Sequence, residues 1–281
     1  MKLQTPVELL SLKNTITYKD KVLFMGSCFA TEVGNIMKSL QFDVMLNPFG
    51  VLYNPASICS SLKRLTNCEP FKGSDIICSQ GLYTSFFHHS TFSKGYPTDF
   101  LENANEALSI DAKNYAKSQW SIITLGTAWV FRHIEKNIIV SNCHKIEEKE
   151  FKREFLETEE IVEMFNEIIA SRKDKKWIFT VSPIRHLKDG AHGNQLSKAT
   201  LLLAIDKLQK KNDNVYYFPA YEIMMDELRD YRFYTEGMTH PTPQAVKYIF
   251  EKFMDFAINK SEYPQMKVAE KQFKSNLHIV R

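Results

Sequence analysis

The sequence predicts a three-layer α/β/α domain around a central, mostly parallel sheet of five strands. Strand and helix signals alternate along most of the 281 residues, which is typical of βαβ units. The strand signals are short continuous apolar runs, such as 22–25, so helices are expected to cover both faces of the sheet. The chain has no internal repeat and no Gly/Ser-rich linker, so we expect one domain over residues 1–281.

The elements of the first half follow from local patterns. Asn54-Pro55 predicts a helix start, with the asparagine as N-cap and the proline in the first turn. The expected elements are strands at 21–25, 42–46 and 121–125, and helices at 30–40, 54–65 and 98–117. The aromatic stretch 76–87 is expected to be irregular and to lie in an insertion at about 67–97.

The second half continues the alternation of strands and helices. Pro243 is tolerated because it falls in the first turn of the last strong helix. The expected elements are a hairpin of 129–133 with 137–140, a long charged helix at 147–173, strands at 177–181 and 215–219, and helices at 196–211 and 242–259. The polar tail from about residue 261 is low in periodicity, so we expect a loosely packed extension.

Composition and charge argue against several classes of protein. The formal net charge of +3 is too small to indicate a nucleic-acid-binding surface. No stretch approaches the roughly 18 apolar residues of a membrane span, and the N-terminus lacks a signal-peptide core. The five cysteines are scattered without a Cys-x-x-Cys pair, which favours reduced thiols over a zinc site. We expect a cytoplasmic protein that binds neither membrane nor nucleic acid.

The turn after the first strand carries the main functional signal. The run 22–25 ends at Gly26-Ser27-Cys28, and a helix follows. Such a turn presents a serine at the carboxyl edge of a parallel sheet, where helix N–H groups favour an anion. A base would activate this serine as a nucleophile, and His240 near the other end of the chain is the candidate. The alternative is a plain N-cap serine, and Cys28 is expected to pack rather than react.

Six motifs between about residues 20 and 255 extend this signal along the chain. They are Gly26-Ser27-Cys28-Phe29-Ala30, Asn47-Pro48-Phe49-Gly50, Asn54-Pro55, Leu125-Gly126-Thr127-Ala128-Trp129, Thr180-Val181-Ser182-Pro183-Ile184-Arg185-His186 and Met238-Thr239-His240-Pro241. In identity and order they resemble the GSCFA-domain family, within the wider SGNH-hydrolase-like group.

This resemblance implies a flavodoxin-like fold with an ester-hydrolase type of site. By position in the motifs, Ser27 corresponds to the nucleophile, Gly50 to a donor of the oxyanion hole and His240 to the catalytic histidine. The implied reaction is acyl transfer through a covalent acyl-enzyme, usually to water, and it needs no cofactor.

Two positions depart from the SGNH pattern. Ala128 stands where an asparagine normally helps to hold the oxyanion, and losing such a donor costs about two to three powers of ten in rate. Asn47 and Asn54 are the candidate replacements. Gly237 stands where an aspartate normally orients the histidine, a role that is worth about four powers of ten in serine proteases. Glu236 is the candidate carboxylate.

Other polar residues follow strands at the same expected edge of the sheet. Gly126 and Thr127 come directly after one strand, and Arg185 after another. A guanidinium there binds a carboxylate or phosphate, or else ties down a loop. His89, in the aromatic insertion, is a candidate for contact with the substrate. No metal site is expected, because adjacent His88 and His89 would point to opposite faces of a strand.

The sequence therefore predicts an SGNH-like serine esterase that acts on a small-molecule or carbohydrate-linked ester. Two alternatives use the same fold. Gly237 and Ala128 favour a catalytically impaired protein that binds a glycan or acyl ligand. An acyltransferase would use the same residues with an acceptor other than water. Neither the substrate nor the oligomeric state follows from the sequence.

Overall fold

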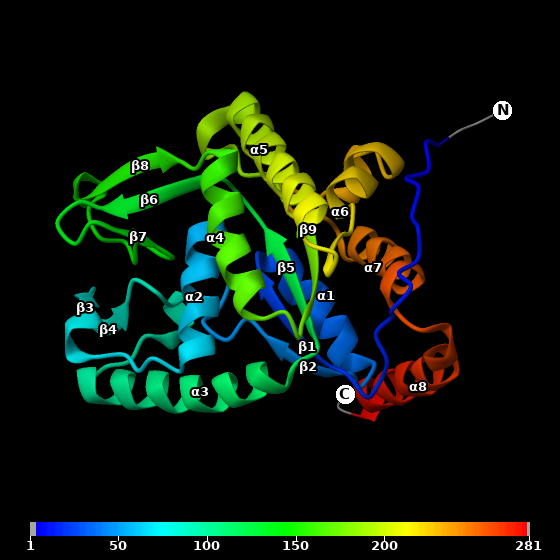
Figure 1. Ribbon diagram of the computed structural model, residues 1–281, viewed down its shortest axis with the longest axis horizontal. Coiled ribbons are helices and arrows are strands. Elements are labelled where there is room, and N and C mark those ends of the chain that lie inside the picture. The colour runs from blue at the N-terminus through cyan, green and yellow to red at the C-terminus, as the bar shows by residue number, and fades with distance from the viewer. Residues whose placement is uncertain (1–3, 280–281) are drawn as a thin grey trace.

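The computed structural model describes residues 4–279, and a five-stranded parallel sheet forms their centre (Figure 1). Its strands are β1 (Lys21–Gly26), β2 (Asp43–Leu46), β5 (Trp120–Leu125), β9 (Lys176–Val181) and β10 (Val215–Tyr217). They lie in the spatial order β10-β9-β5-β1-β2, and all neighbouring pairs are parallel. Numbered along the chain this order is 2-1-3-4-5, which is flavodoxin-like. The predicted fold class is confirmed.

Helices cover both faces of this sheet, because successive residues of each strand point to opposite sides. In β1, Leu23 and Met25 pack into one apolar cluster, whereas Val22 and Phe24 pack into the other. The first cluster is covered by α2 (Pro55–Asn67), α3 (Pro97–Lys117), α4 (Thr158–Ser171) and α5 (Gly190–Lys211). The second is covered by α1 (Cys28–Ser39), α6 (Ala220–Glu222), α7 (Pro243–Ala257) and the start of α8 (Tyr263–Ile279).

Five short antiparallel strands form a side lobe at one end of the molecule, on the left of Figure 1. A hairpin pairs β3 (Ile76–Ser79) with β4 (Leu82–Ser85), and a three-stranded sheet is built from β6 (Trp129–His133), β7 (Ile138–Val140) and β8 (Phe151–Phe155). The backbone N–H of Ser141 donates to the carbonyl of Phe86 at 2.8 Å. This bond joins the two parts of the lobe.

Several predicted elements are confirmed within a few residues. The hairpin of 129–133 with 137–140 corresponds to β6 and β7. Asn54 caps α2 as expected, because its side chain accepts a hydrogen bond from the Ser57 N–H at 2.8 Å, with Pro55 in the first turn. Likewise, the Thr242 side chain caps α7 ahead of Pro243.

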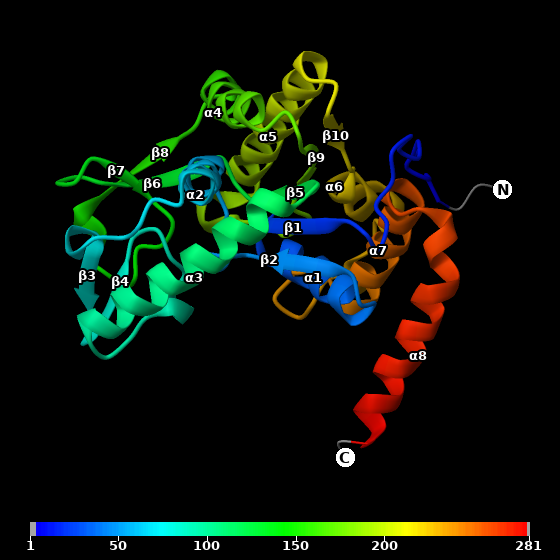
Figure 2. The same ribbon diagram turned by 60° about the horizontal axis from the view of Figure 1, so that its bottom comes forward.

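Three local predictions are wrong. The segment 147–173 is not one helix: residues 151–155 pair antiparallel with β6 and form β8, so α4 starts only at Thr158. The stretch 76–87 is a regular hairpin rather than irregular, because Gln80 and Gly81 both take the positive φ of a tight turn. The tail from 261 forms the helix α8 (Figure 2). Its Met266 and Ala269 are buried.

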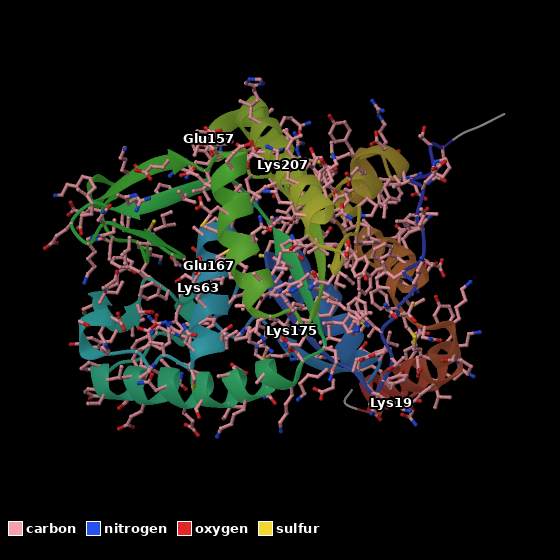
Figure 3. The ribbon with its side chains drawn as sticks, in the orientation of Figure 1. Lys19, Lys63, Glu157, Glu167, Lys175 and Lys207 are labelled. Carbon is pink, nitrogen blue, oxygen red and sulfur yellow. The ribbon has the colours of Figure 1, made fainter. Side chains whose placement is uncertain are left out.

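Ion pairs between helices lie on the outer surface of the molecule. Lys63 of α2 and Glu167 of α4 are 2.6 Å apart (Figure 3). Such exposed pairs contribute little to stability, about 0 to 1 kcal/mol each. The stability of the fold therefore rests mainly on the parallel sheet and its two apolar clusters. Within residues 4–279, no helix is both long enough and apolar enough to cross a bilayer.

Candidate active site

A pocket of about 520 Å³ opens beyond the carboxyl ends of β1, β5 and β9. Cys28 comes from the end of β1, Thr127 from the end of β5 and His186 from the segment after β9. Residues of the β6–β8 sheet close the opposite side. In the 2-1-3-4-5 order the strand sequence reverses between β1 and β5, and ligands bind at this point in flavodoxin-like folds.

The turn that leaves β1 is as sharp as the sequence predicts, and it requires glycine. Gly26 has φ of +141°, and a Cβ atom there would lie 2.1 Å from the carbonyl oxygen of Thr124. The Gly26 N–H donates to the Asn47 side chain at 2.9 Å. The turn is therefore clamped between β5 and the loop that follows β2.

The structure does not bring the hydroxyl of Ser27 into the pocket. Ser27 is 0% exposed, and its Oγ bonds to the Oγ of Ser182 at 3.0 Å, which links the ends of β1 and β9. Ser27 occupies the N-cap position of α1, but its side chain makes no capping bond. The prediction that this turn exposes Ser27 as a nucleophile is wrong, because the turn directs its side chain into the protein interior.

Cys28, the next residue, lines the pocket instead. It is half-buried and is the first residue of α1, so its backbone N–H belongs to the turn that has no acceptor within the helix. The Sγ atom lies 3.6 Å from the hydroxyl of Tyr53. Burial, together with the contact with Cys28, raises the pKa of Tyr53, so this phenol remains protonated at neutral pH.

His240 lines the same pocket from the other end of the chain. Its backbone carbonyl accepts from the Thr235 N–H at 2.8 Å, and its Nδ1 lies 3.0 Å from the Thr239 hydroxyl. Glu236 is exposed and does not line the pocket. Within the described part of the chain no carboxylate lies within 4.0 Å of the His240 ring. The prediction that Glu236 orients His240 therefore finds no contact to support it.

The predicted oxyanion donors separate into one candidate and two structural residues. The Gly50 N–H donates to the Asn47 carbonyl at 2.8 Å. Both ends of the Asn47 amide are used, on Gly26 and on Thr31. Asn54 lines the pocket, and only its oxygen is bonded, to the Ser57 N–H; its amide nitrogen has no partner among residues 4–279. Asn54 is therefore the available donor.

The segment after β5 supports the wall of the pocket. The N–H groups of Gly126 and Thr127 both donate to the carbonyl of Tyr53, at 2.8 and 3.0 Å. Thr127 lines the pocket, and its hydroxyl lies 3.1 Å from that of Ser197. A Cβ atom on Gly126 would lie 2.9 Å from the Tyr53 carbonyl oxygen. Gly126 therefore lets the chain pack closely against Tyr53, and it does not itself line the pocket.

Two further histidines line the pocket. His89 packs on Gly50, whose Cβ would lie 2.3 Å from that of His89. His186 meets the ring of Tyr53 edge-on, with the ring centroids 5.7 Å apart. Burial, followed by the nearby charge of Lys198, lowers the pKa of His186 to about 4, so this imidazole is neutral at pH 7. Residues 4–279 contain no group of three His, Cys, Asp or Glu side chains that could hold a metal.

Sequence reasoning missed Tyr53 and Lys198. Lys198 is buried in α5, and its Nζ donates to the carbonyls of Gly126 and Ser182 at 2.7 and 2.8 Å. Burial lowers the pKa of Lys198 to about 7. One sequence signal exists: Lys198 stands at helical spacing from the apolar Leu201 and Ile205, where a solvated charge is not expected. Tyr53 carries no such signal.

These features define a flavodoxin-like α/β protein with a ligand pocket at its topological switch point. The GSCFA family model matches residues 21–253, and the chain belongs to this family. No curated protein matches the sequence. Among solved structures the chain is similar to an acetyl xylan esterase, Est2A, from the rumen bacterium Butyrivibrio proteoclasticus, with 12% sequence identity and a TM-score of 0.41. The match covers 86% of this chain and 64% of that one.

Proposed function

We propose that this protein hydrolyses acyl esters and that Cys28, rather than Ser27, is the nucleophile. The observation that carries the proposal is the shared pocket of Cys28 and His240 at the switch point, from which Ser27 is excluded. The SGNH-like motifs support the class of reaction. The likeness to a solved esterase is too distant to contribute.

The reaction consists of two acyl transfers. The Cys28 sulfur attacks the ester carbonyl as His240 takes its proton, and a tetrahedral oxyanion forms. The Asn54 amide and the Cys28 N–H donate to this oxyanion. The intermediate collapses to a thioester as His240 protonates the departing alcohol. Water, deprotonated by His240, then cleaves the thioester and regenerates the thiol.

A thiol nucleophile accounts for the missing aspartate at Gly237. A free thiol ionises near pH 8.5, far below a serine hydroxyl, so it depends less on a strongly oriented base. The Thr239 hydroxyl can accept from the Nδ1–H of His240, which leaves Nε2 free to take a proton. Tyr53 supplies a donor beside the sulfur. These neutral contacts replace the carboxylate of a serine triad.

The remaining expectations stay part of the proposal. The substrate is a small-molecule or carbohydrate-linked ester, the reaction needs no cofactor, and the protein acts in the cytoplasm as one domain with an insertion at about 67–97. The exposed position of His240, with no carboxylate contact, favours the binding-protein alternative. The experiment below separates that alternative from catalysis.

The test compares adjacent residues of one turn. We expect Cys28→Ala and His240→Ala each to reduce the hydrolysis of para-nitrophenyl acetate by about a hundredfold or more. Ser27→Ala loses a buried hydrogen bond but retains activity within about tenfold. Mass spectrometry of wild type, quenched during turnover, is expected to find the acetyl group on Cys28.

The variants Ser27→Ala and Cys28→Ala, together with wild type, give a different result for each alternative function. Loss of activity in Ser27→Ala but not in Cys28→Ala, with both proteins folded, would establish a serine mechanism. A folded wild-type protein that neither hydrolyses esters nor acquires an acetyl group would be a binding protein. Acetyl transfer to an added alcohol in preference to water would indicate an acyltransferase.

A further inference from the structure

We propose that the alcohol part of the substrate carries an anionic group, a carboxylate or a phosphate, which Arg185 binds in a second pocket. This inference rests on the proposed hydrolysis at Cys28. It adds a substrate class and a binding site separate from the one that holds the ester.

A second pocket has a volume of about 630 Å³ and adjoins the first at Arg185. Arg185 lines both. The second pocket has an aromatic and sulfur-rich lining of Tyr221, Tyr231, Tyr234, Met224 and Met225. Part of this wall is the π-helical turn Ile223–Glu227, a rare conformation that is found often at functional sites. Arg185 is the residue that the two linings share, so a ligand that reaches Arg185 from the first pocket also meets the second.

The guanidinium of Arg185 lacks a counter-charge within the described part of the chain. It makes no salt bridge or side-chain hydrogen bond there, although it is half-buried. Every other arginine among residues 4–279 has a carboxylate within 4.0 Å: Arg64, Arg132, Arg153, Arg172, Arg229 and Arg232. A partly desolvated guanidinium without a partner is a ready site for an anion, since its planar donors match carboxylate and phosphate oxygens.

The surroundings of Arg185 suit a bound anion. Burial raises the pKa values of Tyr221 and Tyr234, while the positive charge of Arg185 opposes both shifts. Both phenols line the second pocket together with Arg185, and both stay neutral at pH 7. The two acids on this pocket, Asp226 and Asp230, pair with Arg229 at 3.9 Å and Arg232 at 3.6 Å. Neither forms a salt bridge with Arg185.

The position of His240 decides which part of the ester faces Arg185. The Arg185 N–H donates to the carbonyl of Thr239 at 2.9 Å, so Arg185 is attached to the loop that carries His240. A general acid must reach the oxygen of the leaving alcohol. The alcohol therefore lies on the His240 side of the first pocket, and its far end points to Arg185.

The test uses three aryl acetates that differ only in the para substituent: carboxylate, phosphonate or neutral carboxamide. We expect wild type to cleave one or both anionic esters with higher kcat/KM than the carboxamide. Arg185→Gln reduces this preference by about tenfold, mainly through KM, and Arg185→Lys retains part of it. The carboxylate and phosphonate arms identify which anion is preferred.

The control is Arg232→Gln, which removes the same charge from a neighbouring surface position that does not line the second pocket. It is expected to keep the wild-type preference. The inference is overturned if wild type shows no preference for the anionic esters, or if Arg185→Gln leaves that preference unchanged.

A binding measurement keeps this inference separate from the proposed hydrolysis. Calorimetric titration of the Cys28→Ala protein with para-hydroxybenzoate, phenylphosphonate and para-hydroxybenzamide is expected to show tighter binding of an anion, lost when Arg185→Gln is added. Anion-selective binding without any ester cleavage would support the Arg185 site and refute hydrolysis. Ester cleavage without a preference for anions in either assay would support hydrolysis and refute the Arg185 site. If the protein neither cleaves esters nor binds anions selectively, both proposals are refuted.

Discussion

At the scale of single residues, one position along the turn separates a buried side chain from one that faces the pocket. Ser27 and Cys28 are neighbours, yet Ser27 bonds to Ser182 in the interior while Cys28 faces the pocket. Gly26 determines which of the two side chains faces the pocket, because its φ of +141° fixes the direction in which the chain leaves β1. Any side chain at this position would clash with the backbone of Thr124.

We expect Gly26→Ala to destabilise the protein by about 3 kcal/mol or more, since the added Cβ meets backbone in a conformation that favours glycine. Urea unfolding followed by circular dichroism measures the change. Gly95→Ala is the control, because no atom lies within 4 Å of its Cβ position, and it should shift stability by about 0.5 kcal/mol at most. Equal effects of the two substitutions would show that the turn tolerates a side chain.

At the scale of secondary-structure elements, two buried lysines hold strand and helix ends together. Lys198 of α5 donates to the carbonyls that follow β5 and β9, beside the pocket. Lys175, just before β9, donates to the Tyr115 and Ser118 carbonyls at the end of α3, with bonds of 2.6 and 2.5 Å. Each lysine thus gives buried backbone carbonyls at the ends of strands or helices a side-chain donor.

Lys198→Met is expected to lower the free energy of unfolding by about 2 to 4 kcal/mol, because two buried carbonyls lose their donor. Lys207→Met is the matched control on the same helix. Lys207 is exposed (Figure 3). It pairs with Glu159, so its loss should cost about 1 kcal/mol or less. Urea titrations of the two variants make the comparison, and similar losses would contradict the role given to Lys198.

At the scale of the whole molecule, the side lobe and the main sheet enclose the pocket together. Phe131 and Asn142 of the lobe line it opposite Cys28. His88 lies where the lobe joins the body, 1% exposed, with its ring centroid 4.5 Å from that of Phe71 and 5.4 Å from that of Phe100. Burial, with smaller effects of Arg64 and His144, lowers the pKa of His88 to about 3.

This depressed pKa predicts acid sensitivity. Below the ordinary histidine pKa of about 6.5 the unfolded chain binds a proton that folded His88 resists, so stability is complete above that pH and falls as the pH approaches 3. The loss attributable to His88 is about 1.4 kcal/mol per pH unit within this window. His88→Phe and His88→Gln are expected to flatten the dependence of unfolding free energy on pH between 4 and 6. An unchanged slope in both variants would exclude His88 as its source.

The sequence alone determined the sheet, most of its helices and the family, because buried parallel strands, N-caps and the spacing of motifs are local signals. It also indicated the turn after β1, Asn54 and His240 as parts of one site. The prediction of a single helix at 147–173 was wrong, because the five residues of β8 have three charged side chains in a row and show no strand alternation; their strand forms by pairing with β6.

Only the tertiary structure decided which side chains meet. The direction of the Gly26 turn, the bond from Ser27 to Ser182 and the use of the Gly50 and Asn47 groups depend on contacts with distant strands and loops. The same holds for Lys198, whose two acceptors lie at the ends of different strands. A motif specifies which residues are present, but the packing of separate elements determines which of them face a ligand.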